Sequence, residues 1–527
     1  MARIANAVRP RLARAEEAVR PQVARAVEAV KPRLAHAVDI TKPQLARLTA
    51  VRPGKTWQYT AVAAGAGLAL TAVVVSAAGP WDSTGQRTAE RHRAVALDGT
   101  GGADHDGTSG GEGVPAPAPS AGSVLAGLGT AARGAARATP TPASLAAVLD
   151  PLLKNPALGS RHTAVVVDVA TGERLYGAGP DQALTPASTT KIATAVAALS
   201  ALGADHRFTT RAVLEPDTEE LVLVGGGDPT LTAHAETDGW AGLRDLARKT
   251  AKALKKRGLD EITLSYDTTL FTGSQVHPIG VNDNLAPVTA LTADEGRTDD
   301  STSGPVTRVA DPAADATKKF ASVLREQGVK TTAPGPSKAT SRSESLAEVT
   351  SPPLSTLVER MLTNSDNDIA ETLARQVAVA AGTRADFAGG GRAVAATLTR
   401  LGLPLKGTAF RDGSGLDRDD RLTAHLLTAL LVTAGDPGRP ELRAVLTGLP
   451  VAGFTGTLAG RYGDGAAGVV RAKTGTLTGV NTLAGTVVDR DGRMLAFAFL
   501  TADTTDPGAA QSALDRAATA LAGCGCG

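Results

Sequence analysis

The alternation of apolar and polar residues predicts β-strands at both ends of the segment that follows residue 142. The strand pattern occurs in five stretches: 163–169, 174–177, 469–477, 481–488 and 494–500. Each is rich in β-branched or aromatic residues and is bounded by turn formers. Arg490-Asp491-Gly492 joins the last two stretches, which is a hairpin signal. We therefore expect the early and late strands to share one antiparallel sheet.

Between these strands the apolar positions recur at helical spacing. An Ala-rich helix is predicted from Ser188 to Leu202, where Gly203 ends it. Residues 353–379 form a second helical region, interrupted by a polar cluster at 364–368, and residues 507–521 close the chain as an apolar helix. The predicted fold class is α+β, with helices packed on the antiparallel sheet.

A run of 20 residues without a charge, Thr60 to Gly79, is long enough to cross a bilayer as a helix. Residues 1–59 carry 12 Arg and Lys against 4 Asp and Glu, whereas the charges after Trp81 are nearly balanced. By the positive-inside rule, we expect a single-pass anchor at 57–81 in the cell membrane, with the N-terminus cytoplasmic and the rest extracytoplasmic. A cleaved signal peptide is the alternative, but the basic region is too long for one.

Two further segments precede the folded part of the chain. In residues 1–56, Pro10, Pro21, Pro32 and Pro43 recur every 11 residues, a spacing that keeps apolar positions on one helical face. This basic segment is either an amphipathic helix on the inner leaflet or a solvated cytoplasmic tail. Residues 82–142 are rich in Gly, Ala, Pro, Ser and Thr and predict a disordered linker.

Overall composition excludes several classes of function. The net charge of +2 gives no reason to expect a nucleic-acid partner. The eight histidines show no metal-ligand spacing, so we predict no metal and no cofactor. The only two cysteines, Cys524 and Cys526, lie in a Gly-rich tail where they cannot cross-link a core.

Three short motifs carry the candidate chemistry. They are Ser188-Thr189-Thr190-Lys191, Ser365-Asp366-Asn367 and Lys473-Thr474-Gly475, the last followed by Thr476. Together they provide a serine nucleophile beside a lysine, a hydroxyl with an amide, and a cation on a predicted strand. This set is typical of acyl transfer without histidine.

Each motif also has an ordinary structural interpretation. Ser188 could cap a helix whose Lys191 faces water. Ser365 and Asn367 could belong to a turn with an N-cap, and Lys473 could protect an edge strand. The three motifs in this order favour the catalytic interpretation.

These motifs resemble those of the penicillin-binding proteins and serine β-lactamases. Residues 223–231, 286–291 and 412–416 resemble motifs of the low-molecular-mass class C penicillin-binding proteins, which form peptidase family S13. The resemblance is to the actinobacterial members of this family. The resemblance covers about residues 143–522 and implies a β-lactamase/transpeptidase-like domain at 143–205 and 346–527. The sequence separation of 177 from Ser188 to Ser365 fits an inserted module at about 206–345.

The resemblance implies a serine-type D-Ala-D-Ala carboxypeptidase or endopeptidase that acts on peptidoglycan stem peptides and is acylated by β-lactam antibiotics. Ser188 is then the nucleophile, Lys191 its base and Ser365 a proton relay. The substrate-binding residues implied are Asn367, Lys473, Thr474, Gly475 and Thr476, and the backbone amides of Ser188 and Thr476 form the oxyanion hole.

Two other functions stay open. A serine β-lactamase shares the three motifs but needs a dedicated deacylating base, which the sequence does not reveal. A non-catalytic wall-binding protein could retain the fold. Gly225-Gly-Gly-Asp-Pro lacks the Lys-Ser/Thr of a phosphate loop, so we expect no nucleotide binding there. Ser414 lacks the outer glycines of a nucleophile elbow, so we expect it to be structural.

Overall fold

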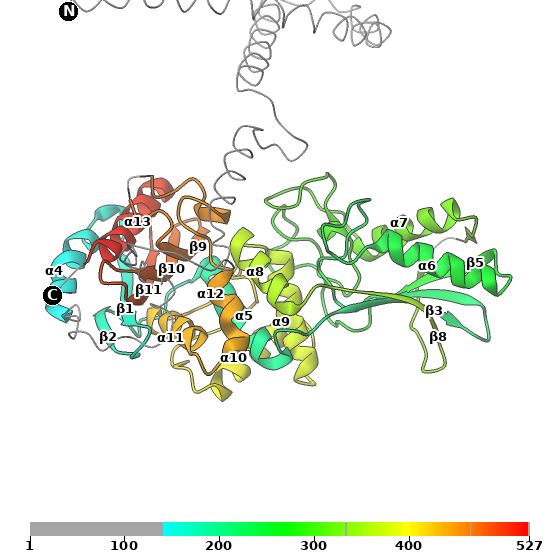
Figure 1. Cartoon of the computed structure of the whole chain (residues 1–527), viewed down its shortest axis with the longest axis horizontal. Coiled ribbons are helices and arrows are strands. Elements are labelled where there is room, and N and C mark those ends of the chain that lie inside the picture. The colour runs from blue at the N-terminus through cyan, green and yellow to red at the C-terminus, as the bar shows by residue number, and fades with distance from the viewer. Residues whose placement is uncertain (1–140, 333–334, 464, 525–527) are drawn as a thin grey trace, which may run out of the picture. The chain divides into compact units, whose positions relative to one another are not determined.

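The computed structural model describes residues 141–332, 335–463 and 465–524, all within one compact unit of the chain (Figure 1). Its helices are α4 (Pro142–Leu153), α5 (Thr190–Leu202), α6 (Leu243–Lys256), α7 (Pro312–Glu326), α8 (Leu354–Asn364), α9 (Asn367–Ala380), α10 (Phe387–Arg400), α11 (Ala424–Gly435), α12 (Arg443–Thr447) and α13 (Pro507–Gly523). Its strands are β1 (Arg161–Asp168), β2 (Arg174–Ala178), β3 (Thr209–Glu215), β4 (Glu220–Val224), β5 (Glu261–Asp267), β6 (Lys330–Thr331), β7 (Gly335–Pro336), β8 (Glu344–Thr350), β9 (Val470–Leu477), β10 (Val480–Val488) and β11 (Met494–Ala502).

The early and late strands form one five-stranded sheet in the order β2-β1-β11-β10-β9. Every neighbouring pair is antiparallel, and β1 pairs with β11 along its whole length, from Arg161 opposite Ala502 to Asp168 opposite Leu495. The predicted antiparallel sheet with flanking helices is therefore confirmed. Strand β9, which carries the Lys473 motif, lies at one edge of this sheet.

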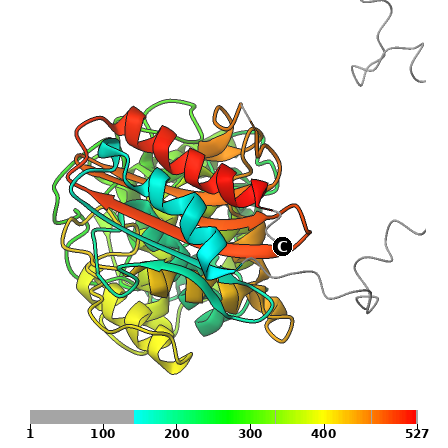
Figure 2. The ribbon, with the colours of Figure 1, turned by 90° about the vertical axis from the view of Figure 1, so that its left-hand side faces the viewer.

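Alternation along β11 explains how the sheet is covered on both faces. Successive side chains of a strand point to opposite faces. Leu495, Phe497 and Phe499 accordingly pack in a core with α4 and α13, whereas Ala496 and Ala498 pack in a core with α5, α8, α9, α10 and α11. Figure 2 shows α13 and α4 crossing the first face, in red and cyan.

The polar interruption predicted at 364–368 ends one helix and starts the next. Ser365 adopts the left-handed conformation at the end of α8, with φ 59°. Asp366 then caps α9, because its side chain accepts a hydrogen bond from the backbone N–H of Ile369 at 3.0 Å. Ser365 and Asn367 therefore lie at a fixed junction between two buried helices.

A second sheet occupies the chain between α5 and α8. Its order is β6-β5-β4-β3-β8, with β7 also paired to β5, and α6 and α7 pack on it around a core of their own. The first and last long strands of this module, β3 and β8, pair with each other from Thr209 opposite Thr350. The two chain segments therefore leave the rest of the fold side by side, as a two-stranded connection.

The glycines of the 225–227 segment let this module approach α9 closely. Gln376 of α9 donates hydrogen bonds to the carbonyls of Gly226 and Gly227, at 2.9 and 3.1 Å. A Cβ at Gly227, where φ is +71°, would meet Gln376 Nε2 at 2.2 Å. Only glycine satisfies both conditions, which gives this motif a structural role.

The expected anchor at 60–79, the 11-residue repeats and the linker up to residue 140 lie outside the described residues, and Pro142, the last residue assigned to the linker, begins α4. Within the described ranges, no helix combines the length and the apolar character needed to cross a membrane. Of the two cysteines, Cys524 is described and is buried.

Replacing Phe497 by alanine tests the core under α13. Phe497 is fully buried, so Phe497→Ala should lower the free energy of unfolding by about 3–5 kcal/mol. Met494→Ala, on the same strand at a half-exposed position, should change it by less than about 0.5 kcal/mol. Urea unfolding of the full chain measures both, and equal losses would contradict the described packing.

Candidate active site

Ser188 lies in a short turn that precedes α5. The 3-10 turn η2 covers Ala187–Thr189, and α5 begins at Thr190 rather than at Ser188 as the pattern predicted. Ala187 has a positive φ of 48°, which regular helix does not allow. The turn still places side chains three positions apart on the same side, so Ser188 and Lys191 face each other.

The Lys191 amine is buried and has three hydrogen-bond acceptors. Its Nζ lies 3.0 Å from Ser188 Oγ, 2.7 Å from Asn367 Oδ1 and 2.8 Å from the backbone carbonyl oxygen of Ser414. The structure thus brings together residues from the first two motifs. The Ser414 carbonyl is an additional partner that the sequence did not indicate.

Burial lowers the pKa of Lys191 to about 8, although Asp412, Glu371, Asp366 and Asp368 act in the opposite direction. A lysine with this pKa has a sizeable neutral fraction near neutral pH, as a general base requires. Burial and the charge of Lys191 also lower the pKa of Lys473 well below its ordinary value. Both cations are fully buried.

Asn367 is fixed at both ends of its side-chain amide. Its Oδ1 accepts from Lys191, and its Nδ2 donates to the backbone carbonyl of Asn284 at 2.9 Å. Asn284 belongs to the inserted module, so this module reaches the site directly. The expected role of Asn367 in holding a substrate amide stays a prediction.

Strand β9 lies against the turn that carries Ser188. A Cβ at Gly475 would meet Thr482 Oγ1 at 2.2 Å, Pro186 O at 2.8 Å and Ser188 N at 3.0 Å. This close approach requires glycine at position 475 and brings the edge strand next to the Ser188 amide.

The other residues of the third motif differ in exposure. Thr476 is exposed, and the Thr474 hydroxyl donates to Thr457 Oγ1 at 2.9 Å. Lys473 is fully buried and donates to the carbonyl oxygen of Thr474 at 2.8 Å.

A cavity of about 370 Å³ opens at these residues. Its lining includes Ser188, Ser365, Asn367, Thr474 and Thr476. The inserted module contributes a second wall, from Asn284 and the segment between Arg297 and Arg308. Apart from Lys191, Lys473 and Gly475, every site residue predicted from sequence borders this cavity, and the two lysines lie buried beside it.

The family model described as "D-Ala-D-Ala carboxypeptidase 3 (S13) family" matches residues 145–305 and 298–521. The chain belongs to the S13 family. The family membership expected from the three motifs is therefore confirmed.

Relatives support this S13 assignment over most of their length. A carboxypeptidase of Mycobacterium tuberculosis is 37% identical over 430 residues, which cover 78% of this chain and 90% of that protein. The D-alanyl-D-alanine carboxypeptidase of an Actinomadura strain is 30% identical over 440 residues, 67% of this chain and 80% of that protein. The crystal structure of penicillin binding protein 4 from Haemophilus influenzae has a TM-score of 0.58 at 22% identity, covering 70% of this chain and 97% of that one, and so shares the fold.

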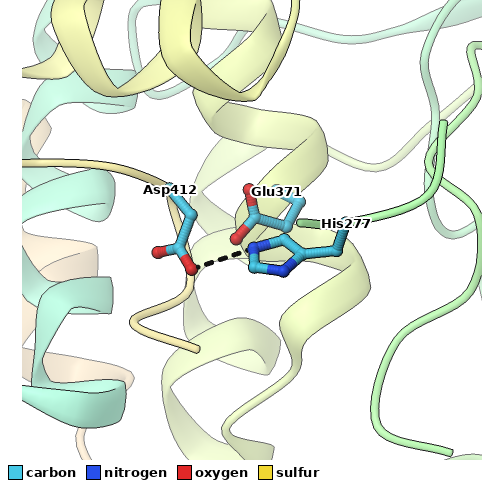
Figure 3. Close-up of side chains that lie close together, drawn as sticks. All are labelled: His277, Glu371 and Asp412. Atoms are coloured by element: carbon cyan, nitrogen blue, oxygen red, sulfur yellow. Dashed lines mark hydrogen bonds and ion pairs between the residues drawn. The ribbon is translucent and has the colours of Figure 1, made fainter. Parts of the chain in front are cut away.

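The sequence did not indicate a buried cluster of ionisable residues that lies beside the S13 motifs. His277 of the inserted module, Glu371 of α9 and Asp412 of the loop after α10 come together in the structure (Figure 3). The only signal for Asp412 was the Asp-Gly-Ser-Gly order, which is typical of a loop whose aspartate binds the following backbone N–H groups. No pattern pointed to His277.

One ligand atom from each of these three residues lies within 4.8 Å of the others, a spacing that could suit a metal ion. The oxygens of both carboxylates, however, already accept hydrogen bonds from backbone N–H groups or from His277. A cation would have to displace several of these buried bonds. The donor set therefore fits a hydrogen-bonded cluster better than a metal site.

A second acidic cluster ties the Ser365–Asn367 junction to the inserted module. Asp368 accepts from Arg308 at 2.8 Å and from the backbone N–H of Ala286 at 2.9 Å. Glu295 accepts from Arg297 at 2.9 Å and from Arg360 at 3.0 Å. Because each acid is paired with an arginine, this cluster stabilises the contact instead of offering a free base.

Replacing Gly475 by alanine tests the close approach of β9. The new Cβ would displace the Ser188 turn, so covalent labelling by a fluorescent penicillin should slow by about 100-fold. Gly460→Ala is the matched control, because a Cβ there meets nothing within 4 Å. If Gly475→Ala labels as fast as Gly460→Ala, the close approach has no influence on the nucleophile.

Proposed function

We propose that this chain is a serine-type D-Ala-D-Ala carboxypeptidase that acts on peptidoglycan stem peptides, with an acyl-enzyme on Ser188. The observation that carries the proposal is the 3.0 Å contact between Ser188 Oγ and the buried amine of Lys191, at a cavity lined by the other two motifs. The relatives named as carboxypeptidases, which cover most of this chain, support it.

The partners of Lys191 define its role as base. A neutral amine keeps two N–H donors and gains one lone pair. Asn367 Oδ1 and the Ser414 carbonyl can only accept, so they take the two N–H groups. Ser188 is the one partner with a proton to donate, and the lone pair of the neutral amine faces its hydroxyl. Lys191 then removes the proton as Ser188 attacks the carbonyl carbon between the two D-alanines.

The remaining steps are assigned from the lining of the cavity. The backbone N–H groups of Ser188 and Thr476 stabilise the tetrahedral oxyanion. Ser365 passes a proton to the leaving D-alanine. Thr474 and Thr476 bind the terminal carboxylate, and the negative charge of that carboxylate favours the charged form of the Lys473 amine. Water then hydrolyses the acyl-enzyme, and a β-lactam acylates Ser188 through an ester of the same kind.

The carboxylates that line the cavity favour a peptidase over a β-lactamase. Among the described lining residues these are Asp366 and Asp368. Asp366 caps α9, and Asp368 is bound by Arg308 and by the backbone N–H of Ala286. Neither is free to activate a water molecule for rapid deacylation. We therefore expect a long-lived penicillin adduct.

The proposal includes a location. The uncharged run at 60–79 and the excess of positive charge before it support a membrane anchor with a cytoplasmic N-terminus. The linker at 82–142 then spaces the catalytic domain from the membrane on the side where peptidoglycan lies.

The nucleophile is tested by Ser188→Ala. This variant should lose both D-alanine release from a pentapeptide and covalent labelling by fluorescent penicillin, each by at least about 1,000-fold. Ser512→Ala, at an exposed position of α13, should behave as the wild type. Covalent labelling that survives in Ser188→Ala would assign the nucleophile elsewhere.

Release of D-alanine from a pentapeptide, set against cleavage of a cross-linked dimer, separates carboxypeptidase from endopeptidase.

The pH dependence of acylation tests the base. Lys191 must be neutral to accept the proton, and its pKa is about 8. The acylation rate should therefore rise by about tenfold per pH unit well below pH 8 and level off above it. Stopped-flow labelling between pH 6 and 10, with circular dichroism to verify the fold, measures this. A rate that falls with pH would exclude a neutral Lys191 as the base.

A further inference from the structure

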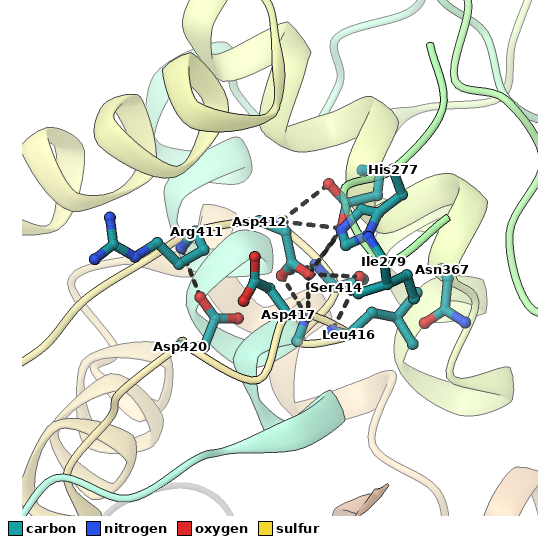
Figure 4. Close-up of polar contacts among 12 residues, drawn as sticks. His277, Ile279, Asn367, Arg411, Asp412, Ser414, Leu416, Asp417 and Asp420 are labelled. Carbon is teal, nitrogen blue, oxygen red and sulfur yellow. Dashed lines mark hydrogen bonds and ion pairs between the residues drawn. The ribbon is translucent and has the colours of Figure 1, made fainter. Parts of the chain in front are cut away.

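The loop that provides the Ser414 carbonyl is shaped by one buried carboxylate. Asp412 Oδ1 accepts from the backbone N–H groups of Ser414 at 3.1 Å and Gly415 at 2.6 Å, and Oδ2 accepts from that of Asp417 at 2.7 Å (Figure 4). A Cβ at Gly415 would meet the carbonyl oxygen of Ala187 at 1.9 Å. The loop therefore lies directly against the turn Ala187–Thr189, which carries Ser188.

Two helices hold the same loop from either side. Glu371 Oε1 on α9 accepts from the backbone N–H of Gly413 at 3.1 Å and of Ser414 at 2.8 Å. Thr194 on α5 donates to the carbonyl oxygen of Gly413 at 2.6 Å. These contacts fix the direction in which the Ser414 carbonyl points.

The inserted module completes this arrangement through His277. His277 Nε2 donates to Asp412 Oδ2 at 3.1 Å, because its Nδ1 already accepts from the backbone N–H of Ile279 at 3.2 Å. Both side chains are 1% exposed, and the imidazole packs edge-on against Phe387. The tautomer and the ring orientation are both fixed.

The other acceptor of Lys191 also depends on this module. Asn367 presents Oδ1 to Lys191 because its Nδ2 is occupied by the carbonyl of Asn284. Each of the two acceptors that direct the Lys191 lone pair is thus held from the segment 277–284.

We propose that the segment 277–284 of the inserted module positions the general base. His277 acts through Asp412 on the Ser414 carbonyl, and Asn284 acts through Asn367, so that the neutral Lys191 amine directs its lone pair at Ser188. His277, Asp412 and Glu371 are positioning residues in this scheme. The inference rests on the proposed acyl-transfer function and adds that the module takes part in each acylation.

The charges around Lys191 make the pH dependence of acylation a test of this positioning role. Lys191 faces the carboxylates of Asp412, Glu371, Asp366 and Asp368, and its charge also acts on Lys473. Glu371 in turn is influenced by His277 and Asp412, and acts on Arg375 and Asp420. Burial and the charge of Asp412 raise the pKa of Glu371 to about 7, so it titrates in the range where acylation is measured.

The first experiment removes the link to the module. His277→Gln in the full chain should lower the rate of fluorescent penicillin acylation by about 10- to 100-fold, because the Ser414 carbonyl loses its fixed direction. The matched control is His425→Gln, which breaks a surface His–Asp pair with Asp181 at 2.8 Å. This control should stay within about twofold of the wild type.

The second experiment separates positioning from stability. Glu371→Gln keeps an oxygen acceptor for Gly413 and Ser414 but removes a negative charge that raises the pKa of Lys191. The acidic limb of the acylation profile should therefore move to lower pH, by about half a unit or more. A merely structural role would lower the melting temperature and leave the limb in place.

The outcomes distinguish this inference from the function on which it rests. If the wild type is labelled, but His277→Gln stays within twofold of it or Glu371→Gln leaves the acidic limb unmoved, the positioning role is overturned. The Glu371→Gln profile decides the matter if His277→Gln fails to fold. A wild type that no penicillin labels would overturn the proposed function and this inference together.

Discussion

The buried amine of Lys191 is the constraint on which the rest of this site depends. Removing a charged amine from water costs several kcal/mol unless other groups compensate it. Here three oxygen acceptors surround Nζ, and four buried carboxylates favour its charged form. Burial still dominates and lowers the pKa to about 8. The same balance that gives this amine its low pKa also requires its surroundings to be fixed.

Each compensating group requires partners of its own, which extends the site outward. The carboxylates of Asp412 and Glu371 are satisfied by backbone N–H groups of one loop and by His277. Asp368 is satisfied by Arg308, which also donates to the carbonyl oxygen of Glu295 at 2.7 Å. His277, Arg308 and Glu295 all belong to the inserted module. The Lys191 amine beside Ser188 is thus connected, through hydrogen bonds, to the inserted module, which has a sheet and a core of its own.

Local patterns predicted the parts of this arrangement that depend on neighbours in sequence. The strands of the first sheet followed from alternation, the Ser188–Lys191 pair from its three-residue spacing, and the break before α9 from its polar cluster. The contact between His277 and Asp412 joins positions 135 apart, and no local pattern records such a pair. Ser414 was assigned a structural role from its side chain, but its contribution is a backbone carbonyl, which every residue possesses.

The inserted module is attached to the rest of the fold at several points. Strands β3 and β8 pair where the module leaves the fold, and backbone bonds from Ser351 to Phe208 and from Leu354 to His206 continue that pairing to α8. This connection fixes one point of the module, and the contacts of His277, Asn284 and Gln376 fix others near the site. Because the interior is closely packed, a small movement of the inserted module changes these hydrogen bonds together, and with them the position of the Ser414 carbonyl. In the proposed mechanism, acylation therefore depends on the position of the inserted module as well as on the three motifs.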